Sequence, residues 1–361
     1  MKTCIKILVF RCVWFFLKIL SFFKSKNVEI ELPARNGDDV TIIINGNKIS
    51  HPNLIPLLDG NDDYTGMIGY YSKGSIDYKF LLKVFPYADL IMLASSGPAF
   101  KKDWMLFKPF FKAVFAPTMN CNIEKRKHLN VSYTMVLRSC PYNGLFWENT
   151  NSKFEYDYSI LTWVDDDKFK RWDRSAKLIP QLSERSVKGI IHTQRKTADD
   201  MIFENRDKYI KSGLVTLSSD NMSEDSFNNY MSKAAVGIFP NTIDALPKHM
   251  IECLLANKRI VISKDLLFGH DMLVDLGSDI VMSVDFEEDG VEDKITAFIK
   301  SEVKRSPRNV FLDKYGVDKL SMLWAKEFNM LFGTTYKHIY PSKHYHRVKE
   351  YKNIYGDFNE E

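Results

Sequence analysis

Short apolar runs alternate with amphipathic segments over the second half of the chain. The apolar runs have the length and the Val, Ile and Leu content of strands in a parallel sheet, and they cover residues 159–164, 188–193, 214–219, 234–240, 259–264 and 279–284. The segments between them show helical spacing and cover residues 171–184, 197–211, 224–233, 246–256 and 268–276. This alternation, with short connecting loops, predicts a doubly wound parallel sheet with right-handed crossovers.

The pattern is less regular in the first half of the chain. Residues 28–32 and 40–44 form two apolar runs, and the Asn36-Gly37 pair between them is typical of a β-hairpin. Further strands are predicted at residues 66–71, 89–95 and 113–116, with helices at residues 77–85 and 101–111. This half is therefore also expected to be α/β.

The length and composition indicate a globular protein of two domains. The chain has 361 residues, of which 45% are hydrophobic and 27% charged. An Asn-Gly turn at Asn143-Gly144 marks a boundary between the halves. We predict a hydrophobic and basic segment, an N-terminal domain, a C-terminal domain and a polar tail, at residues 1–26, 27–150, 151–335 and 336–361.

Net charge and cysteine spacing indicate which partners and which compartment to expect. The formal net charge is +4, and no run of Lys and Arg is long enough to bind successive phosphates of a nucleic-acid backbone. We therefore expect no nucleic-acid partner. The five cysteines lack the spacing of metal ligands, which favours reduced thiols in a cytosolic setting.

The first 26 residues are rich in aromatic and aliphatic side chains and contain no acidic residue. A spanning helix needs about 20 residues with few or no charges. Arg11 and Lys18 would each cost roughly 2.5–3.5 kcal/mol at the centre of a bilayer. We therefore expect an interfacial anchor on anionic lipid at the cytosolic face. Two alternatives stay open: a single-pass anchor, or a soluble cytoplasmic protein in which residues 6–10 form the first strand and residues 13–23 the first helix.

Two carboxylates stand eight residues apart between two of the predicted strands. Asp244 precedes Pro247 at the expected helix start, where it can cap the helix. Glu252 follows on the face turned away from the apolar stripe. A strand that leads into a helix at the carboxyl edge of a parallel sheet is a common nucleotide site. The alternative is that Asp244 only caps the helix and that Glu252 is a solvated surface residue.

This segment resembles the donor-site signature of retaining glycosyltransferases of the family 4-like group, which have the GT-B fold. Their motif is a Glu, seven residues and a second Glu, with Gly after the first Glu and a Pro three residues after it. The chain has Asp244, Ala245, Pro247 and Glu252 in that register. It departs from the family in having Asp for the first Glu, Ala245 for the Gly and Arg259 for a usual Pro.

The resemblance implies two Rossmann-like domains that face a cleft, with a UDP- or GDP-linked nucleotide sugar bound mainly by the second domain. It implies transfer of the sugar, with retention and without a cofactor, to a glycan, lipid or protein acceptor. In the family the first carboxylate contacts donor-sugar hydroxyls and the second contacts the ribose. This assigns catalysis to Asp244 and donor binding to Glu252, with Ala245 and Leu246 at the helix start. It also implies that the helix at residues 317–332 returns to the first domain.

A run of three aspartates, Asp165-Asp166-Asp167, follows the first predicted strand of the second half. It resembles the motif that holds Mn²⁺ or Mg²⁺ in GT-A glycosyltransferases, because such cations prefer oxygen ligands. A metal-dependent GT-A-like transferase that uses Asp165 and Asp167 is therefore an alternative, and a solvated acidic turn is another. In the GT-B register the same loop holds the donor phosphates, and its cations are Lys168, Lys170 and Arg171.

Two classes of function follow from these residues. The first is a nucleotide-sugar-dependent glycosyltransferase. The second is a non-catalytic GT-B-like binding or scaffold protein at a membrane, which the departures from the family motif and the three aspartates favour.

Overall fold

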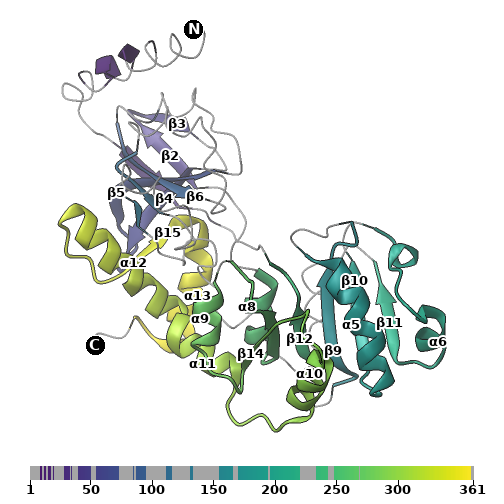
Figure 1. Cartoon of the computed structure of the whole chain (residues 1–361). Helices are drawn as coiled ribbons and strands as arrows, with labels where there is room; N and C mark the ends of the chain where they lie inside the picture. Colours follow the sequence, from purple (N-terminus) through teal and green to yellow (C-terminus); the bar gives the residue numbers. More distant parts are fainter. Residues whose placement is uncertain are drawn as a thin grey trace. The chain divides into compact units, whose positions relative to one another are not determined.

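The structure is a computed structural model. It describes residues 28–32, 34, 40–49, 54–72, 84, 87–94, 111–115, 131–132, 154–165, 170–193, 196–219, 233–242, 248–267 and 269–358, together with single residues between 9 and 19. The chain forms two compact units (Figure 1). One unit contains Met1–Asn143 and Val317–Glu361, and the other contains Gly144–Gly316.

The second unit is built on a six-stranded parallel sheet in the order β11-β10-β9-β12-β13-β14. Its strands are β9 (Tyr156–Thr162), β10 (Gly189–Thr193), β11 (Val215–Ser218), β12 (Ala234–Phe239), β13 (Arg259–Ser263) and β14 (Val281–Val284). The chain begins in the middle at β9, runs outward to β11 and then returns to β12 on the other side of β9. The predicted doubly wound sheet is therefore confirmed.

Helices lie between these strands and after the last of them. They are α5 (Trp172–Glu184), α6 (Arg206–Lys211), α8 (Lys248–Leu255), α9 (His270–Val274), α10 (Val291–Lys300) and α11 (Pro307–Tyr315). The helix predicted at residues 197–211 is split into the 3₁₀ helix η4 (Ala198–Asp200) and α6. It breaks because Met201 and Phe203 turn into the core and Asn205 takes a left-handed conformation. The helix predicted at residues 224–233 lies outside the described residues, apart from Lys233.

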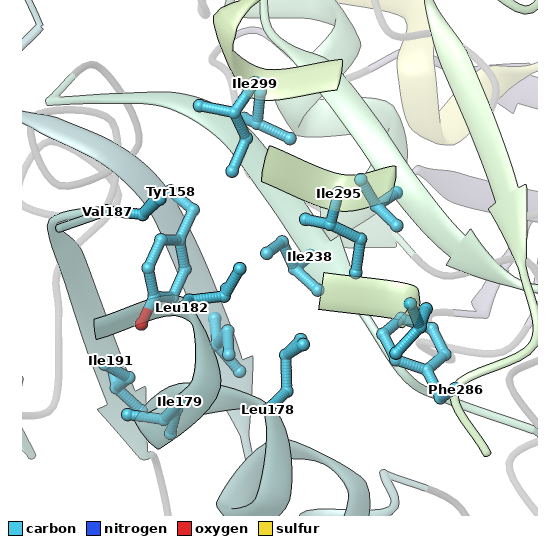
Figure 2. Packing of buried hydrophobic residues seen from close by; sticks show 14 of the residues in the cluster. Tyr158, Leu178, Ile179, Leu182, Val187, Ile191, Ile238, Phe286, Ile295 and Ile299 are labelled. Carbon is cyan, nitrogen blue, oxygen red and sulfur yellow. The ribbon is translucent and has the colours of Figure 1, made fainter. Parts of the chain in front are cut away.

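The core of this unit lies between the sheet and the helices α5 and α10. Leu178 and Leu182 of α5 and Ile295 of α10 pack with Tyr158 and Ile238 of the central strands (Figure 2). All of them are nearly or fully buried. Apolar burial of this kind is the main force that holds the strands in place and so fixes the carboxyl ends from which a site is built.

The first unit contains a second six-stranded sheet in the order β15-β4-β5-β6-β7-β8. Its strands are β4 (Leu54–Asp59), β5 (Tyr64–Ser72), β6 (Asp89–Ala94), β7 (Ala113–Phe115), β8 (Val131–Ser132) and β15 (Ile339–Pro341). The pairings from β5 to β8 are parallel, and β4 and β15 pair antiparallel at one side. The helices predicted at residues 77–85 and 101–111 lie outside the described residues, apart from Val84 and Phe111.

A separate antiparallel sheet consists of β1 (Val28–Glu31), β2 (Thr41–Ile44) and β3 (Asn47–Ile49). The pairing of β1 with β2 confirms the predicted hairpin. The strands β3, β4 and β15 were not predicted. An Asn45-Gly46 turn, with φ of 50° and 78°, leads from β2 into β3. This dipeptide is typical of a hairpin and would have predicted β3.

The C-terminal segment belongs to the first unit. It contains α12 (Val317–Phe332), β15, the 3₁₀ helix η5 (Ser342–His344) and α13 (Tyr345–Tyr355). The prediction of a polar tail at residues 336–361 is wrong, because Tyr340, Val348 and Phe358 are buried against Leu58 and Val317. The predicted end of the C-terminal domain at residue 335 is also wrong, since α12 lies in the first unit, as the family resemblance implied.

The described residues near the N-terminus are helical. Val9, Phe15 and Phe16 are more than half exposed, at 57%, 59% and 71%. The helical state of Val9 contradicts the alternative in which residues 6–10 form a strand. Within the residues that the structure describes, none of the helices combines the length and apolar content needed to cross a bilayer.

Candidate functional site

The order of the strands in the second unit defines a switch point between β9 and β12. Successive strands are added on one side of β9 up to β11 and on the other side from β12 onward. Open parallel sheets bind ligands at such a point, outside the carboxyl ends of the strands. We call the carboxyl ends of β9, β10, β12, β13 and β14, with the loops that follow them, the carboxyl edge.

Buried polar side chains gather at the carboxyl ends of these strands. Thr162 ends β9, Thr193 ends β10 and Ser263 ends β13, while Asn241 follows β12 by two residues. Each of these side chains belongs to a residue that is at most 1% exposed. Buried polar groups are costly unless they form hydrogen bonds, and ligand sites use small numbers of such groups to orient a substrate. Their position agrees with a ligand site at the carboxyl edge.

Glu252 lies on α8, the helix that follows β12, and is 1% exposed. Its Oε2 atom lies 2.8 Å from Nδ1 of His249, one helical turn earlier. The prediction that Glu252 projects away from the core, and the alternative of a solvated surface residue, are both wrong. His249 was not predicted as a site residue, although residues three apart on a helix are neighbours. A buried carboxylate with a polar partner is suited to hold a polar ligand group.

The C-terminal end of α8 is closed by a Schellman motif. Asn257 has φ of 61°, as the left-handed stop predicted at this position requires. Its N–H donates to the carbonyl of Leu254, and the N–H of Lys258 donates to the carbonyl of Cys253, both at 2.9 Å. Cys253 is fully buried, and burial raises the pKa of its thiol well above the usual range, so this cysteine is not a nucleophile.

Two predicted phosphate ligands lie on the loop after β9 and differ in their surroundings. Lys170 is 9% exposed, and its Nζ lies 5.1 Å from the centroid of the Trp163 ring. Arg171 donates to Asp173 at 2.7 Å and to Glu287 at 3.0 Å. The hydrogen bond to Asp173 raises the pKa of Arg171 and lowers that of Asp173. Arg171 is thus engaged by two carboxylates, and Lys170 stays a candidate phosphate ligand.

Several predicted site residues lie outside the part of the chain that the structure describes. They are Asp244, Ala245, Leu246, Lys168, Asp166 and Asp167. Asp165 is described and is exposed. No group of three or more His, Cys, Asp or Glu side chains placed to hold a metal occurs among the described residues, a set that leaves out Asp166 and Asp167. The metal alternative therefore stays a hypothesis.

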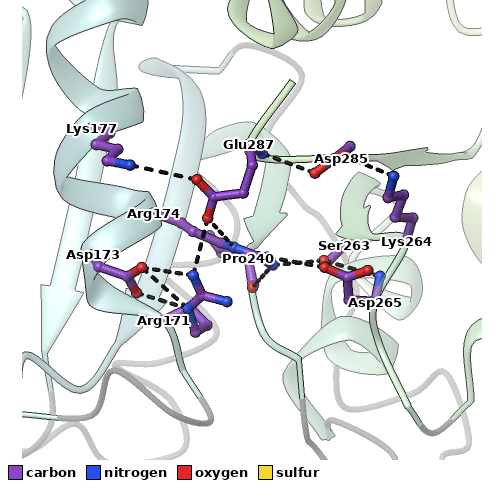
Figure 3. Close-up of polar contacts among 10 residues, drawn as sticks. All are labelled: Arg171, Asp173, Arg174, Lys177, Pro240, Ser263, Lys264, Asp265, Asp285 and Glu287. Atoms are coloured by element: carbon purple, nitrogen blue, oxygen red, sulfur yellow. Dashed lines mark hydrogen bonds and ion pairs between the residues drawn. The ribbon is translucent and has the colours of Figure 1, made fainter. Parts of the chain in front are cut away.

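A network of ion pairs crosses the carboxyl edge (Figure 3). At its centre is Arg174 of α5, whose side chain is 4% exposed. Arg174 contacts Asp265 at 2.9 Å and Glu287 at 3.0 Å. It also donates to the hydroxyl of Ser263 at 3.0 Å and to the carbonyl of Pro240 at 3.4 Å. Arg174 was not predicted as a site residue, because a single arginine in an amphipathic helix does not stand out in the sequence.

Comparison with solved structures identifies similar folds. TarM has a TM-score of 0.56 and 14% identity over 84% of this chain, which spans 64% of the length of TarM. A point mutant of S. aureus TarM, in complex with Fondaparinux, alpha-GlcNAc-glycerol and UDP, has a TM-score of 0.52 and 12% identity, with coverage of 88% of this chain and 86% of that chain. The UDP-forming α,α-trehalose-phosphate synthase from Burkholderia xenovorans, in complex with glucose-6-phosphate, has a TM-score of 0.53 and 10% identity, with coverage of 73% and 72%.

No protein-family model and no curated protein sequence matches the chain. The similar structures are glycosyltransferases with the GT-B fold. At these levels of identity the likeness concerns the fold, and it agrees with the two α/β units and their parallel strands. The chain therefore has the two-domain, Rossmann-like GT-B fold of glycosyltransferases.

Proposed function

We propose that the protein is a glycosyltransferase that moves a sugar from a nucleotide sugar to an acceptor, with retention of the anomeric configuration. The observation that carries this proposal is the burial of Glu252 beside His249 on the helix that follows β12. Glu252 stands eight residues after Asp244, as in the donor-site motif that the segment resembles. Most glutamates lie at the surface, where water solvates the carboxylate. A buried carboxylate needs hydrogen-bond donors, and the hydroxyls of a ribose are suitable donors.

The roles of the other residues follow from the same register. Asp244 would contact hydroxyls of the donor sugar, with Ala245 and Leu246 beside it at the helix start. A cation from Lys168, Lys170 or Arg171 would bind the diphosphate. A cation near the leaving diphosphate stabilises charge that develops in the transition state, and positioning supplies much of the remaining rate enhancement. This mechanism needs neither a metal nor a protein nucleophile.

The ligands bound in the similar structures guide the choice of donor and acceptor. TarM was crystallised with UDP and alpha-GlcNAc-glycerol, and the trehalose-phosphate synthase is UDP-forming. UDP-linked sugars are therefore the first donors to test, and GDP-linked sugars are the second. A glycan acceptor is favoured over a lipid or protein acceptor on the same ground.

The proposal is tested by incubating purified protein with UDP- and GDP-sugars and measuring release of the nucleoside diphosphate. Hydrolysis of one donor, without added acceptor, is expected, because many transferases pass the sugar slowly to water. The matched variants are Glu252→Gln, which removes the buried charge, and Glu302→Gln, which changes an exposed glutamate. Loss of hydrolysis in the first variant alone supports the proposal. Absence of nucleotide binding at millimolar concentrations would favour the scaffold function.

The metal-dependent alternative is separated by the same assay with EDTA or Mn²⁺. Activity that requires Mn²⁺ and disappears in both Asp165→Asn and Asp167→Asn would favour the GT-A-like mechanism. Activity that persists in EDTA would favour the metal-independent mechanism proposed here.

We also propose that the protein is attached to the cytosolic face of a membrane through residues 1–26. The supporting observation is that Val9, Phe15 and Phe16 are helical and largely exposed, in a segment with six Lys/Arg and no acidic side chain. A helix with exposed aromatic side chains and basic neighbours binds anionic interfaces by apolar burial and by charge attraction.

Vesicle sedimentation tests the attachment. The full chain is expected to bind vesicles that contain anionic lipid, and removal of residues 1–26 is expected to abolish binding without lowering the melting temperature. Salt should weaken binding only in part, because apolar burial persists when charges are screened. Resistance to an alkaline carbonate wash would instead indicate a spanning helix. A large fall in melting temperature on truncation would indicate that the segment belongs to the fold of the first unit.

A further inference from the structure

The side chain of Arg174 joins the segments that follow three neighbouring strands. Its guanidinium reaches Pro240 after β12, Ser263 and Asp265 at the end of β13, and Glu287 after β14 (Figure 3). We infer that Arg174 is a positioning residue, which holds these three segments in the arrangement that donor binding requires. The inference rests on the proposed function, because it concerns the same carboxyl edge.

Arginine is suited to this role for a geometric reason. Its guanidinium carries five N–H donors in a rigid plane, whereas a lysine carries three donors on one atom. Nε of Arg174 donates to Glu287, Nη1 to Ser263 and Pro240, and Nη2 to Asp265. Three nitrogens therefore point at three strand ends, and a lysine at this position could not contact all three at once.

The charges around Arg174 balance. The cations of the network are Arg171, Arg174, Lys177 and Lys264, and its acids are Asp173, Asp265, Asp285 and Glu287. The hydrogen bond from Arg174 is the main cause that lowers the pKa of Glu287. A network whose charges are already paired offers little attraction for a phosphate, so the contribution of Arg174 is to geometry.

The segment after β12 is the one whose position matters most for the donor. Pro240, held by Arg174, stands four residues before Asp244 in the sequence. Two residues further on, the carbonyl of Thr242 accepts a hydrogen bond of 2.9 Å from the N–H of Leu267, which follows β13. The segments after β12 and β13 are thus joined to each other and to α5. A substitution of Arg174 is therefore expected to increase the local mobility of the segments after β12 and β13 together.

Arg185 provides a matched control on the same helix. It caps the C-terminal end of α5 and binds two acids of α10, Glu292 at 2.9 Å and Asp293 at 2.5 Å. Arg174 and Arg185 therefore both link α5 to two carboxylates. Only Arg174 does so at the carboxyl edge.

The experiment compares Arg174→Lys and Arg185→Lys in the full chain by hydrogen–deuterium exchange of peptides that cover residues 239–242 and 263–267. Arg174→Lys should speed exchange in these peptides several-fold, because local opening becomes easier, while Arg185→Lys should leave it unchanged. Arg174→Lys should also lower kcat for the donor at least about 10-fold, since small displacements of reacting groups are costly. Its effect on UDP affinity should be smaller than threefold.

Unchanged exchange in Arg174→Lys, or an equal increase in Arg185→Lys, overturns the inference. So does faster exchange combined with full turnover. A wild-type protein that binds no nucleotide sugar overturns the proposed function instead, and in that case the exchange data alone still decide whether Arg174 orders the carboxyl edge. Arg174→Met serves as a second variant, which removes the positive charge as well as the N–H donors of the guanidinium. If Arg174 had only a structural role, its substitution would lower the melting temperature, and kcat and UDP affinity would change by the same factor.

Discussion

The imidazole Nδ1 of His249 lies 2.8 Å from Oε2 of Glu252, and the glutamate is buried while the histidine side chain is 24% exposed. The pair therefore places a carboxylate inside the second unit with an imidazole between it and solvent. A charge in such a place is costly unless it is paired and hydrogen-bonded. The contact with His249 supplies one such partner and offsets part of that cost.

Glu252→Gln is expected to weaken binding of the nucleoside diphosphate by about 1–3 kcal/mol, because it removes a charged acceptor of ribose hydrogen bonds. The fold should persist, since the amide has the shape of the carboxylate. Calorimetric titration with UDP measures the effect, and Glu302→Gln is the control at an exposed position. Equal affinity in both variants would contradict a role of Glu252 in donor binding.

The parallel sheet of the second unit could be predicted from sequence because each strand is a short apolar run. The burial of Glu252 could not. Helical spacing places this residue away from the stripe of Met250 and Leu254, but spacing does not show what the rest of the unit packs against that face. Arg174 escaped prediction for a related reason, because its partners lie between 66 and 113 residues away in the sequence.

The fold of the C-terminal segment also could not be predicted from the sequence. Its tyrosines, lysines and histidines were interpreted as a polar tail, yet β15 contributes three buried residues that pair with β4. A strand this short carries no alternation that distinguishes it from a loop. Only the neighbouring strand, 280 residues earlier in the register Ile339–Asp59, makes it part of a sheet.

Gly189 leaves room for the ring of Tyr158 on the neighbouring strand. The two residues are direct partners in the register of β9 and β10, and a Cβ at Gly189 would lie 2.1 Å from Cζ of Tyr158. We expect Gly189→Ala to lower the free energy of unfolding by about 1–3 kcal/mol through overpacking. Urea denaturation measures this change in the free energy of unfolding. In a Tyr158→Val background the same substitution should cost much less, and an equal cost there would show that the contact is not the cause.

Lys258 is 1% exposed, and its Nζ lies 3.7 Å from the centroid of the Phe154 ring. Burial lowers the pKa of Lys258 to about 7. Below pH 7 the lysine is charged in both states, so the folded state bears the whole cost of burying the charge. Between pH 7 and the ordinary pKa of lysine near 10.4, the folded state is deprotonated and the unfolded state is not, so the cost declines as the pH rises.

Lys258→Met is therefore expected to raise the free energy of unfolding by about 1–4 kcal/mol at pH 6, with a gain that shrinks toward pH 10. The cation–π contact with Phe154 offsets part of the burial cost and sets the lower end of this range. Denaturant titrations at pH 6, 8 and 10 measure the effect, with Lys300→Met as the exposed control. A gain that is the same at all three values would contradict the lowered pKa.

Lys352 connects the C-terminal helix α13 to the turn between β4 and β5. Its Nζ donates to the carbonyl of Gly60 at 2.7 Å and to Asp62 at 3.0 Å, and it lies 4.8 Å from the centroid of the Phe358 ring. Asp62, which has φ of 68°, also accepts a hydrogen bond from the hydroxyl of Tyr340 in β15. The side chain of Lys352 is 12% exposed, so this contact is better shielded from water than the surface ion pairs of the chain.

Lys352→Met is expected to lower the free energy of unfolding of the first unit by about 1–3 kcal/mol, because the carbonyl of Gly60 and the carboxylate of Asp62 both lose a donor. The partial exposure of Asp62, at 31%, favours the lower half of this range. Lys352→Arg should recover part of the loss, while Lys349→Met, at an exposed position of the same helix, should be neutral. Limited proteolysis is expected to release residues after 335 faster in Lys352→Met than in Lys349→Met. Equal rates would show that burial of Tyr340 and Val348 alone holds the C-terminal segment in place.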